Sequence, residues 1–257
     1  MPIMILPVPG IPAIHADTDL SQVLATAISD SKLGVKAGDV LVVCQKIVSK
    51  AEGRIVALDG IEPSDLARRW AEAHEKDPRL VELVFRESNR IVRMERGNLI
   101  VETGPGWICA NAGIDQSNAV EEGTVTLLPL DADASAEKLR EGLRQQLGVD
   151  FAVIVTDTFG RPWREGQVEF ALGVAGLNPI EDLGGTPDLI GRELGVTQIA
   201  AADQLASAAG LAMGKSDGMP AILIRGWVPA PNTRPDESGR ANNGTRLIRP
   251  TENDLFR

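Results

Sequence analysis

The chain has 257 residues, of which 43% are hydrophobic and 24% charged, and it carries a formal net charge of −10. This composition excludes a disordered chain and supplies enough apolar side chains for one large core or two smaller ones. The acidic balance argues against a general nucleic-acid surface, because such a surface needs clustered lysine and arginine.

The first half of the chain alternates short apolar runs with amphipathic and turn-rich segments. Thr18 or Asp19 is the expected cap of the first helix, and Leu66, Trp70 and Ala73 share one apolar face of a later helix, which indicates core packing. We expect, in chain order, a strand at 2–8, a loop at 9–19, a helix to about residue 30, a buried strand running into a polar segment at 38–54, helices at 64–76 and 79–88, strands at 90–96 and 98–102, and a loop at 103–118.

The second half is predicted as a strand at 124–128, a helix at 135–147, a buried strand at 151–155, a loop at 156–167, a strand at 169–175, a loop at 181–192, a strand near 196–201, a helix at 204–213 and a strand at 221–225. Because strands and helices mix without strict βαβ alternation, we predict a mixed α+β fold. We expect one domain over 1–257, with two sub-lobes and the site between them as the alternative organisation. Residues 229–257 are rich in Pro, Asn and Gly, so we expect them to form an extended tail that runs along the surface or against a partner subunit.

Several classes of site and location are disfavoured. No stretch approaches the roughly 18 to 20 apolar residues of a membrane span, and the N-terminus lacks the features of a signal peptide, so we expect a cytoplasmic protein. Cys44 and Cys109 each lie in an apolar run, which favours buried thiols over a disulfide. His15 and His74 are too few and too scattered for a zinc site.

The segment TDTFGRPWREGQ at 156–167 directly follows the buried strand at 151–155. Since open α/β sheets bind ligands where strands end, Asp157 and Thr158 could hold a divalent cation through oxygen. Arg161 and Arg164 could clamp phosphate or carboxylate oxygens in a planar fork. The alternative is an ordinary turn whose arginines pair with Asp157 and Glu165 for structural reasons.

Asp115 is the second acidic candidate, in the polar run NAGIDQSN that follows an apolar entry. Together with Asp157 it could grip a metal pair through hard oxygen ligands. Taken alone, its pattern slightly favours an Asx-turn.

GLAMGKS at 210–216 resembles a phosphate-binding P-loop, but it has three residues rather than four between its glycines. It also follows a predicted helix instead of a strand. We therefore interpret Gly214 as a helix stop, although Lys215 could reach a phosphate.

Seven segments occur in an order that resembles the coenzyme F420-0:γ-glutamyl ligase family: GIPAI, KIVSKAEGR, CANAGIDQSN, TDTFGRPWREGQ, DLIGREL, LAMGKSDGMPAILIRG and DLFR. The resemblance runs from about Gly10 to the C-terminus. It implies a ligase that uses GTP and a divalent metal to add L-glutamate to a deazaflavin precursor, first by an amide to its terminal carboxylate and then through γ-linkages. Some members carry a fused nitroreductase-like domain; because this chain ends at Arg257, we expect the ligase alone.

Carried over by position, the resemblance makes Asp115, Asp157 and Thr158 the ligands of Mg²⁺ or Mn²⁺ in a two-metal site, and it leaves a K⁺ requirement open. The expected catalytic cations are Lys50, Arg161 and Arg164. Nucleotide contacts are expected at Ile11, Pro12, Ala13, Ile14, Gln45, Lys46, Lys50, Asn118, Met213, Gly214, Lys215, Ser216, Asp217, Gly218 and Met219. Gln45 and Lys46 stand where members often have small hydroxyl residues, so they depart from the family pattern.

The implied reaction begins with phosphorylation of the acceptor carboxylate by GTP, and the glutamate amine then attacks the acyl phosphate, with release of GDP and phosphate. Glu165 and Glu169 are candidates for the base. The alternatives are a related amide ligase acting on a different acid and a non-catalytic module that binds a nucleotide or a deazaflavin. We expect small-molecule substrates (GTP, L-glutamate and F420-0), no nucleic acid, no membrane and a homodimer.

Overall fold

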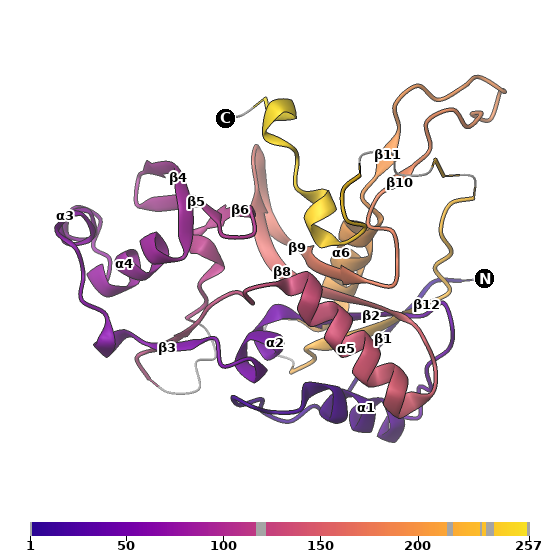
Figure 1. Ribbon diagram of the computed structural model, residues 1–257, viewed down its shortest axis with the longest axis horizontal. Coiled ribbons are helices and arrows are strands. Elements are labelled where there is room, and N and C mark those ends of the chain that lie inside the picture. Colours follow the sequence, from indigo (N-terminus) through magenta and orange to yellow (C-terminus); the bar gives the residue numbers. More distant parts are fainter. Residues whose placement is uncertain (1, 117–121, 215–217, 232, 235–238, 256–257) are drawn as a thin grey trace.

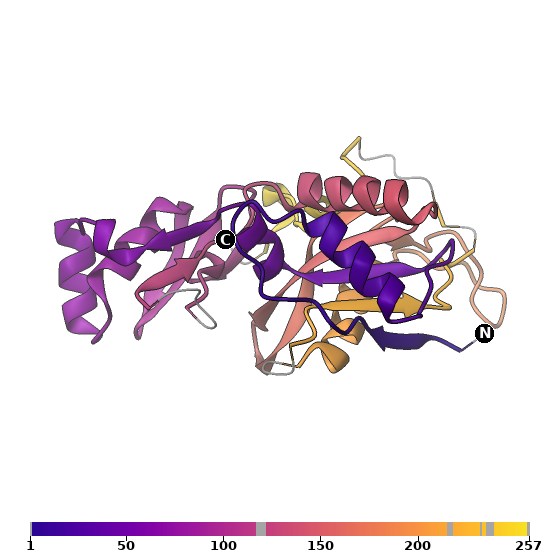
Figure 2. The ribbon, with the colours of Figure 1, turned by 90° about the horizontal axis from the view of Figure 1, so that it is seen from below.

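The computed structural model describes residues 2–116, 122–214, 218–231, 233–234 and 239–255. A larger body surrounds a five-stranded sheet, and a smaller group of helices and strands lies at the other end of the molecule (Figures 1 and 2). Helices combine with parallel and antiparallel strand pairs, which confirms the predicted α+β class.

The central sheet holds the longest apolar runs of the chain. Only β2 and β8 pair in parallel, and every other neighbouring pair in this sheet is antiparallel. In spatial order its strands are β1 (Met4–Pro7), β12 (Ala221–Arg225), β2 (Val40–Cys44), β8 (Ala152–Arg161) and β9 (Arg164–Ala175).

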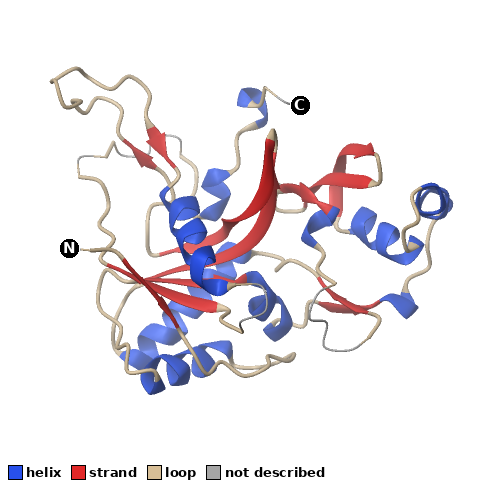
Figure 3. Cartoon of the chain, turned by 180° about the vertical axis from the view of Figure 1, so that it is seen from behind, coloured by secondary structure: helices blue, strands red, loops and turns tan. Residues whose placement is uncertain are grey.

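Both faces of this sheet are covered by helices. Side chains alternate along a strand, so Leu41 and Val43 join one apolar cluster while Val40 and Val42 join the other. The first cluster includes residues of α1 (Leu20–Asp30), α2 (Gln45–Ala51) and α5 (Ala132–Leu147), and the second includes α6 (Ala201–Met213) (Figure 3). Burial on both faces explains why β2 reads as an unbroken hydrophobic run.

Helix boundaries follow the capping side chains. Asp19 accepts a hydrogen bond from the Gln22 backbone N–H, which confirms the predicted cap of α1. The predicted start of α5 was three residues late, because Asp131 is the cap and accepts from Ala134 N at 2.9 Å. The helix α6 ends at Met213 with Gly214 as its cap, as the helix-stop interpretation predicted.

The smaller group is built from short elements around two apolar clusters. One sheet holds β4, β5 and β6, and β3 pairs with β7 in a second. Its elements are β3 (Ile55–Ala57), η1 (Leu58–Gly60), α3 (Asp65–Ala73), α4 (Pro78–Arg86), β4 (Ser88–Glu95), β5 (Asn98–Thr103), β6 (Ile108–Ala110), η2 (Asn111–Gly113) and β7 (Thr124–Thr126).

The predicted core face of α3 was partly wrong. Leu66 is 49% exposed and Ala73 is also exposed, whereas Ala67 and Ala71 are buried and Trp70 packs beside them. Ala67 and Ala71 are small and spaced four residues apart, so they let α3 approach α4 closely. The buried face of α3 is therefore centred one residue after the predicted Leu66.

Three segments expected as irregular are ordered elements. The polar segment after β2 is the helix α2, with the sequence QKIVSKA, and four of its side chains are buried. The loop at 103–118 contains β6 and η2. The loop at 156–167 is a hairpin, in which β8 and β9 stay paired as far as Arg161 and Arg164.

The hairpin is held by cross-strand pairs that one strand's sequence does not reveal. Asp157 lies opposite Phe170, Thr158 opposite Glu169, and the Phe159 and Phe170 rings stack with centroids 6.0 Å apart. The metal-ligand candidates therefore lie inside a strand rather than in the turn after it.

The remaining segments lie on the sheet's periphery. The strand expected near 196–201 reduces to β11 (Gln198–Ile199), which pairs with β10 (Glu181–Asp182). The tail contains η3 (Gly244–Leu247) and η4 (Thr251–Asn253). Asp133 accepts hydrogen bonds from the backbone N–H groups of Gly244 and Thr245, which ties η3 to its own chain. Among the helices of the described residues, none is both long and apolar enough to cross a bilayer.

We expect Gly173→Ala to destabilise the fold, because β9 passes directly against the first turn of α5. A Cβ at this position would lie 1.9 Å from the Ala132 carbonyl oxygen, and backbone cannot move aside cheaply. The free energy of unfolding, measured by urea titration, should fall by about 2 kcal/mol or more. Gly60→Ala is the control, since no atom lies within 4 Å of its Cβ; equal effects of the two substitutions would contradict this packing argument.

Candidate functional site

The candidate site lies at the end of the parallel strand pair. The strand β2 stops at Cys44, opposite Thr156, whereas β8 runs on for five more residues and is paired there with β9. The carboxyl ends of parallel strands are the usual ligand-binding edge of an α/β sheet. Asp157 is the first residue of β8 beyond the end of β2.

Three other chain segments emerge at this edge. Pro7 of β1 pairs with Ile222, and Ala221 at the start of β12 pairs with Val43 near the end of β2. Val8 N donates to Ala221 O at 3.0 Å, which places the start of the following loop beside β12. The loop after β1, the helix α2 and the segment before β12 therefore start from the same end of the sheet as Asp157.

A cavity of about 630 Å³ opens between the β8 hairpin and the segment that contains β6 and η2. Asp115, Asp157 and Thr158 all line it, although they come from distant parts of the sequence. Asp115 is fixed by an isolated β-bridge, in which it exchanges two backbone hydrogen bonds of 2.9 Å with Thr126. This bridge sets the position of the Asp115 backbone.

Opposite charges meet at this cavity. Lys46 Nζ lies 2.6 Å from Asp115 Oδ2. Burial and the neighbouring Lys46 ammonium lower the pKa of Lys50, while Asp115 acts in the opposite direction. The helix α2 therefore places two cations close to Asp115.

The Asp157 carboxylate also influences both cysteines. Burial, with a smaller contribution from Asp157, raises the pKa of Cys44 to about 11 and that of Cys109 to about 12. Both thiols are free, as predicted.

Glu169 holds the hydroxyl groups on the other face of β8. Thr158 Oγ1 donates to Glu169 Oε1 at 2.5 Å, and Thr156 Oγ1 lies 3.1 Å from Glu169 Oε2. The Glu169 side chain packs against Gly210, where a Cβ would lie only 2.7 Å from Glu169 Cγ. Gly210 is thus a close-packing position between α6 and β9, a role the P-loop comparison did not suggest.

The donor set suits Mg²⁺ or Mn²⁺ bound in a particular way. Among the described residues, no three His, Cys, Asp or Glu side chains gather as a metal cage. Mg²⁺ is commonly held by one or two carboxylates while substrate phosphates and water complete its shell. Asp115 and Asp157 offer two carboxylates, and Thr158 keeps lone pairs while it donates its proton to Glu169.

The backbone beside this cavity is strained. Asn111, Ala112 and Gly113 have φ values of 52°, 54° and 68°, which places three consecutive residues in the left-handed region. Such a conformation costs a non-glycine residue about 1–3 kcal/mol and is concentrated at functional sites. The apolar entry that precedes Asp115 in the sequence is the segment that carries this strain.

The predicted arginines are placed differently from one another. They face each other across the hairpin, but Arg161 lines the cavity and Arg164 is an exposed residue outside its lining. Arg161 Nη2 donates to the Glu165 carbonyl at 3.0 Å, and its buried Nε finds no hydrogen-bond partner among the described residues. Arg161 is therefore the better placed of the two to meet an anion in the cavity.

The predicted nucleotide contacts are divided between core and surface. Ile14 and Met213 are buried in the two apolar clusters, Ile11 and Met219 pack against them, and Pro12 and Ala13 are exposed. Gln45 is fully buried and accepts a hydrogen bond from Ser49 at 2.8 Å. Gly214 and Gly218, both with positive φ, flank the segment before β12. Asn118, Lys215, Ser216 and Asp217 lie outside the described residues.

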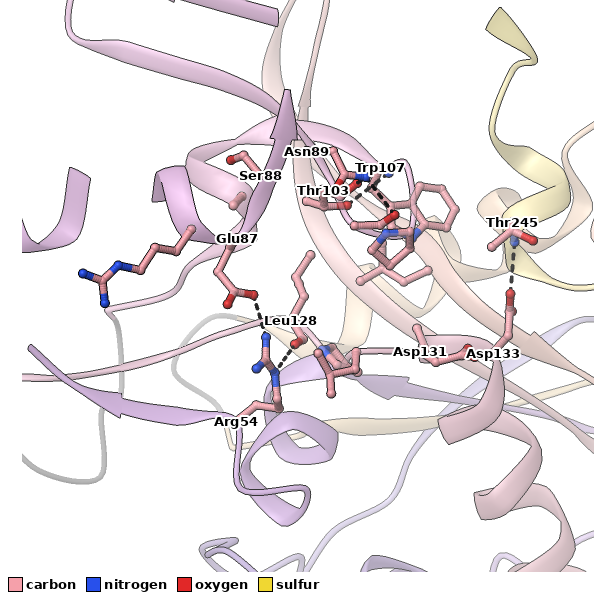
Figure 4. A pocket seen from close by; sticks show the side chains of 18 of the residues that line it. Arg54, Glu87, Ser88, Asn89, Thr103, Trp107, Leu128, Asp131, Asp133 and Thr245 are labelled. Atoms are coloured by element: carbon pink, nitrogen blue, oxygen red, sulfur yellow. Dashed lines mark hydrogen bonds and ion pairs between the residues drawn. The ribbon is translucent and has the colours of Figure 1, made fainter. Parts of the chain in front are cut away.

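Sequence reasoning missed a second cavity, also of about 630 Å³ (Figure 4), whose lining shares the segment around β6 and η2 with the first cavity. Its lining comes from the smaller group, the start of α5, β9 and the tail, and includes Arg54, Glu87, Asn89, Trp107, Asp133 and Thr245. No single stretch of sequence contains enough of these residues to have indicated it.

Comparison with known proteins identifies relatives along the whole chain. The sequence model of a family described as F420-0:Gamma-glutamyl ligase matches residues 10–226. A protein of Methanothermobacter thermautotrophicus named Coenzyme F420:L-glutamate ligase is 45% identical over 259 residues, covering 100% of both chains. Proteins of the same name from Methanopyrus kandleri and Archaeoglobus fulgidus are 44% and 43% identical, covering 98% and 88% of this chain and 96% and 88% of their own.

We expect Cys44 and Cys109 to resist alkylation in the folded protein. With pKa values of about 11 and 12, less than about one thiol in a thousand is ionised at pH 8. Treatment with iodoacetamide followed by mass spectrometry should leave both unmodified, whereas the same treatment in guanidinium chloride should alkylate both. Stoichiometric alkylation under native conditions would show that these thiols are accessible and ionised.

Proposed function

The chain belongs to the F420-0:gamma-glutamyl ligase family, and on that premise we propose that it is a GTP- and divalent-metal-dependent ligase that adds L-glutamate to coenzyme F420-0. The acceptor is then a deazaflavin acid, and the products are its glutamyl amide, GDP and phosphate.

One observation carries the proposal beyond family membership. Asp115 and Asp157 line one cavity at the carboxyl end of a parallel strand pair, with Lys46 and Lys50 of α2 close to Asp115. Two carboxylates suit a cation that also binds phosphate, and adjacent lysines suit the phosphates themselves. This combination supports phosphoryl transfer more strongly than simple ligand binding.

The first step joins the acceptor carboxylate to the γ-phosphoryl group. A carboxylate oxygen attacks the γ-phosphorus, the bond from that phosphorus to the bridging oxygen breaks, and GDP leaves. A divalent cation, when bound by Asp115, Asp157 and Thr158, supplies neutralisation of the phosphate charge.

The side chains around the cavity reduce the repulsion between the two anions. Lys46 is paired with Asp115, so a cation that takes over this carboxylate leaves the Lys46 ammonium available to a phosphate. Arg161 adds positive charge in the lining of the cavity, and Lys50 of α2 adds it close to Lys46 and Asp115. We assign these three residues to charge stabilisation.

In the second step the glutamate amine, having lost a proton, attacks the acyl carbon, and the carbon–oxygen bond to phosphate breaks. Glu169 accepts a hydrogen bond from Thr158 Oγ1, so we assign it to positioning Thr158 rather than to the role of base. Glu165 is exposed on the hairpin and remains the candidate base.

Two alternatives make different predictions. A related ligase acting on another acid would yield GDP and phosphate only with that acid, which a panel of acceptors analysed by mass spectrometry would reveal. A non-catalytic binding module would bind nucleotide or deazaflavin without turnover. Detection of GMP and pyrophosphate would redirect the proposal to nucleotidyl transfer.

We expect GDP and phosphate only when F420-0, L-glutamate, GTP and Mg²⁺ or Mn²⁺ are supplied together. Asp115→Asn and Asp157→Asn should each lower turnover by at least about 100-fold, because they weaken the cation site without emptying the core. Asp30→Asn, at the exposed end of α1, is the matched control. Normal metal-dependent turnover in either site variant would remove that residue from the proposed machinery.

We expect Glu169→Gln to weaken Mn²⁺ binding by about 10- to 100-fold, as loss of a partner that orients a metal ligand commonly does. Glutamine keeps one acceptor oxygen and replaces the other with an amide N–H₂ that can only donate, so the acceptor that orients the Thr158 hydroxyl loses its charge or is lost altogether. Free Mn²⁺ can be measured by electron paramagnetic resonance in the presence of GDP, without acceptor or glutamate. Glu165→Gln on the same hairpin is the control, and equal affinity in Glu169→Gln and wild type would exclude the positioning role.

A further inference from the structure

We propose that the second cavity, which is bounded by Arg54, Trp107, Leu128, Asp133 and Thr245, binds the planar ring of the carboxylate acceptor. This inference rests on the proposed function, and it assigns to a separate cavity the part of the acceptor that does not react. The acid end of the acceptor would then reach the cavity of Asp115 and Asp157.

The size of the second cavity suits a large ligand. Its volume of about 630 Å³ lies within the range of roughly 300–1,000 Å³ that is common for sites of cofactor-sized molecules. Glutamate would fill only a small part of this space. The acceptor, with a fused aromatic ring system, matches this size, and the nucleotide is assigned by its phosphates to the cavity of Asp115 and Asp157.

The floor of the cavity is apolar and carries an aromatic ring. Trp107 packs against the cluster of Leu128, Ala132 and Leu172 and is half-buried, so part of the indole remains at the cavity (Figure 4). A conjugated ring gains both apolar burial and stacking on such a surface. Glutamate has little apolar surface with which to use it.

One side of the cavity is formed by Arg54, whose guanidinium has more hydrogen-bond donors than the described residues use. Arg54 Nε donates to the Leu128 carbonyl at 2.9 Å, and Nη2 lies 2.6 Å from Glu87 Oε2. No described residue accepts a hydrogen bond from Arg54 Nη1, and the side chain is 20% exposed. The guanidinium therefore keeps donors for an anionic group at the edge of the apolar floor.

Arg54 also lies on the way to the reaction site. Its backbone N–H donates to Ser49 O at 2.8 Å, which places it directly after α2, the helix that carries Lys46 and Lys50. An acid tail that passes Arg54 thus moves toward the lysines beside Asp115. The ring and the reacting carboxylate would occupy cavities on two sides of one segment.

That segment forms a wall common to both cavities. Trp107 and Ala112 line the second cavity, while Ile108, Asn111 and Gly113 line the cavity of the two aspartates. One stretch of backbone thus contributes to both cavities, which is why we place two ends of one molecule in them. The tail closes the far side, because Asp133 holds Thr245 at the cavity's edge (Figure 4).

The test is direct binding of F420-0 to the full chain without GTP or glutamate, followed through the fluorescence of the deazaflavin. Trp107→Leu should raise the dissociation constant by about tenfold, and Trp107→Phe, which keeps a ring, should recover most of the loss. Trp163→Leu removes an exposed indole at the hairpin tip and should change nothing. Urea unfolding of each variant establishes that it folds.

A second arm separates the ring from the tail. Arg54→Gln should weaken binding of F420-0 while leaving the affinity for the same chromophore without its acid tail within about twofold. The Michaelis constant for glutamate should be unchanged in Trp107→Leu.

Two results would overturn the assignment while the proposed function stands: turnover by the wild type with an unchanged F420-0 dissociation constant in Trp107→Leu, or a rise confined to the glutamate Michaelis constant. Failure of the wild type to bind F420-0 at all would instead overturn both the assignment and the proposed function.

Discussion

The difference in length between two paired strands determines the arrangement of the whole site. The parallel pairing of β2 with β8 ends at Cys44 and Thr156, and β8 continues with β9 as its described partner. This continuation places Asp157 and Thr158 beyond the end of β2, where both line the cavity that Asp115 also lines. Asp157 influences both cysteines, whereas Thr158 is bonded to Glu169. The paired strands β8 and β9 therefore position the Asp157 carboxylate and the Thr158 hydroxyl outside the core.

Charge balance explains how acids can gather in a protein whose net charge is already −10. Asp115 is neutralised by Lys46 at 2.6 Å, and Lys50 lies close enough to both groups that each affects its pKa. Partly buried carboxylates are costly without such partners. The lysines of α2 thus stabilise the acid site before any ligand arrives, and they are the same groups that can meet the phosphates of a nucleotide.

The sequence predicts the strands that are buried on both faces of the sheet, but it does not predict the strands that depend on pairing with a distant segment. The runs at 40–44 and 151–155 read as strands because both faces of the sheet are covered. The sequence of 156–167 predicts a loop, because its polar residues and glycines are typical of turns, whereas the hairpin is stabilised by partners on β9. Likewise, the contact of Glu169 with Gly210 and the second cavity join segments far apart in the chain. The homodimer stays a prediction, because the fold of one chain does not specify its partner.

The strained wall between the two cavities is held in place from the side of Arg54. A Cβ at position 113 would lie 2.7 Å from the Leu128 side chain, so this side chain packs directly on the left-handed backbone of Gly113. The carbonyl of Leu128 accepts the hydrogen bond from Arg54 Nε. Leu128 therefore touches the wall through its side chain and the cation through its backbone. The left-handed backbone of Asn111 and Ala112 is thus followed directly by a glycine on which a residue of the second cavity packs, and any side chain at position 113 would displace Leu128 from this place.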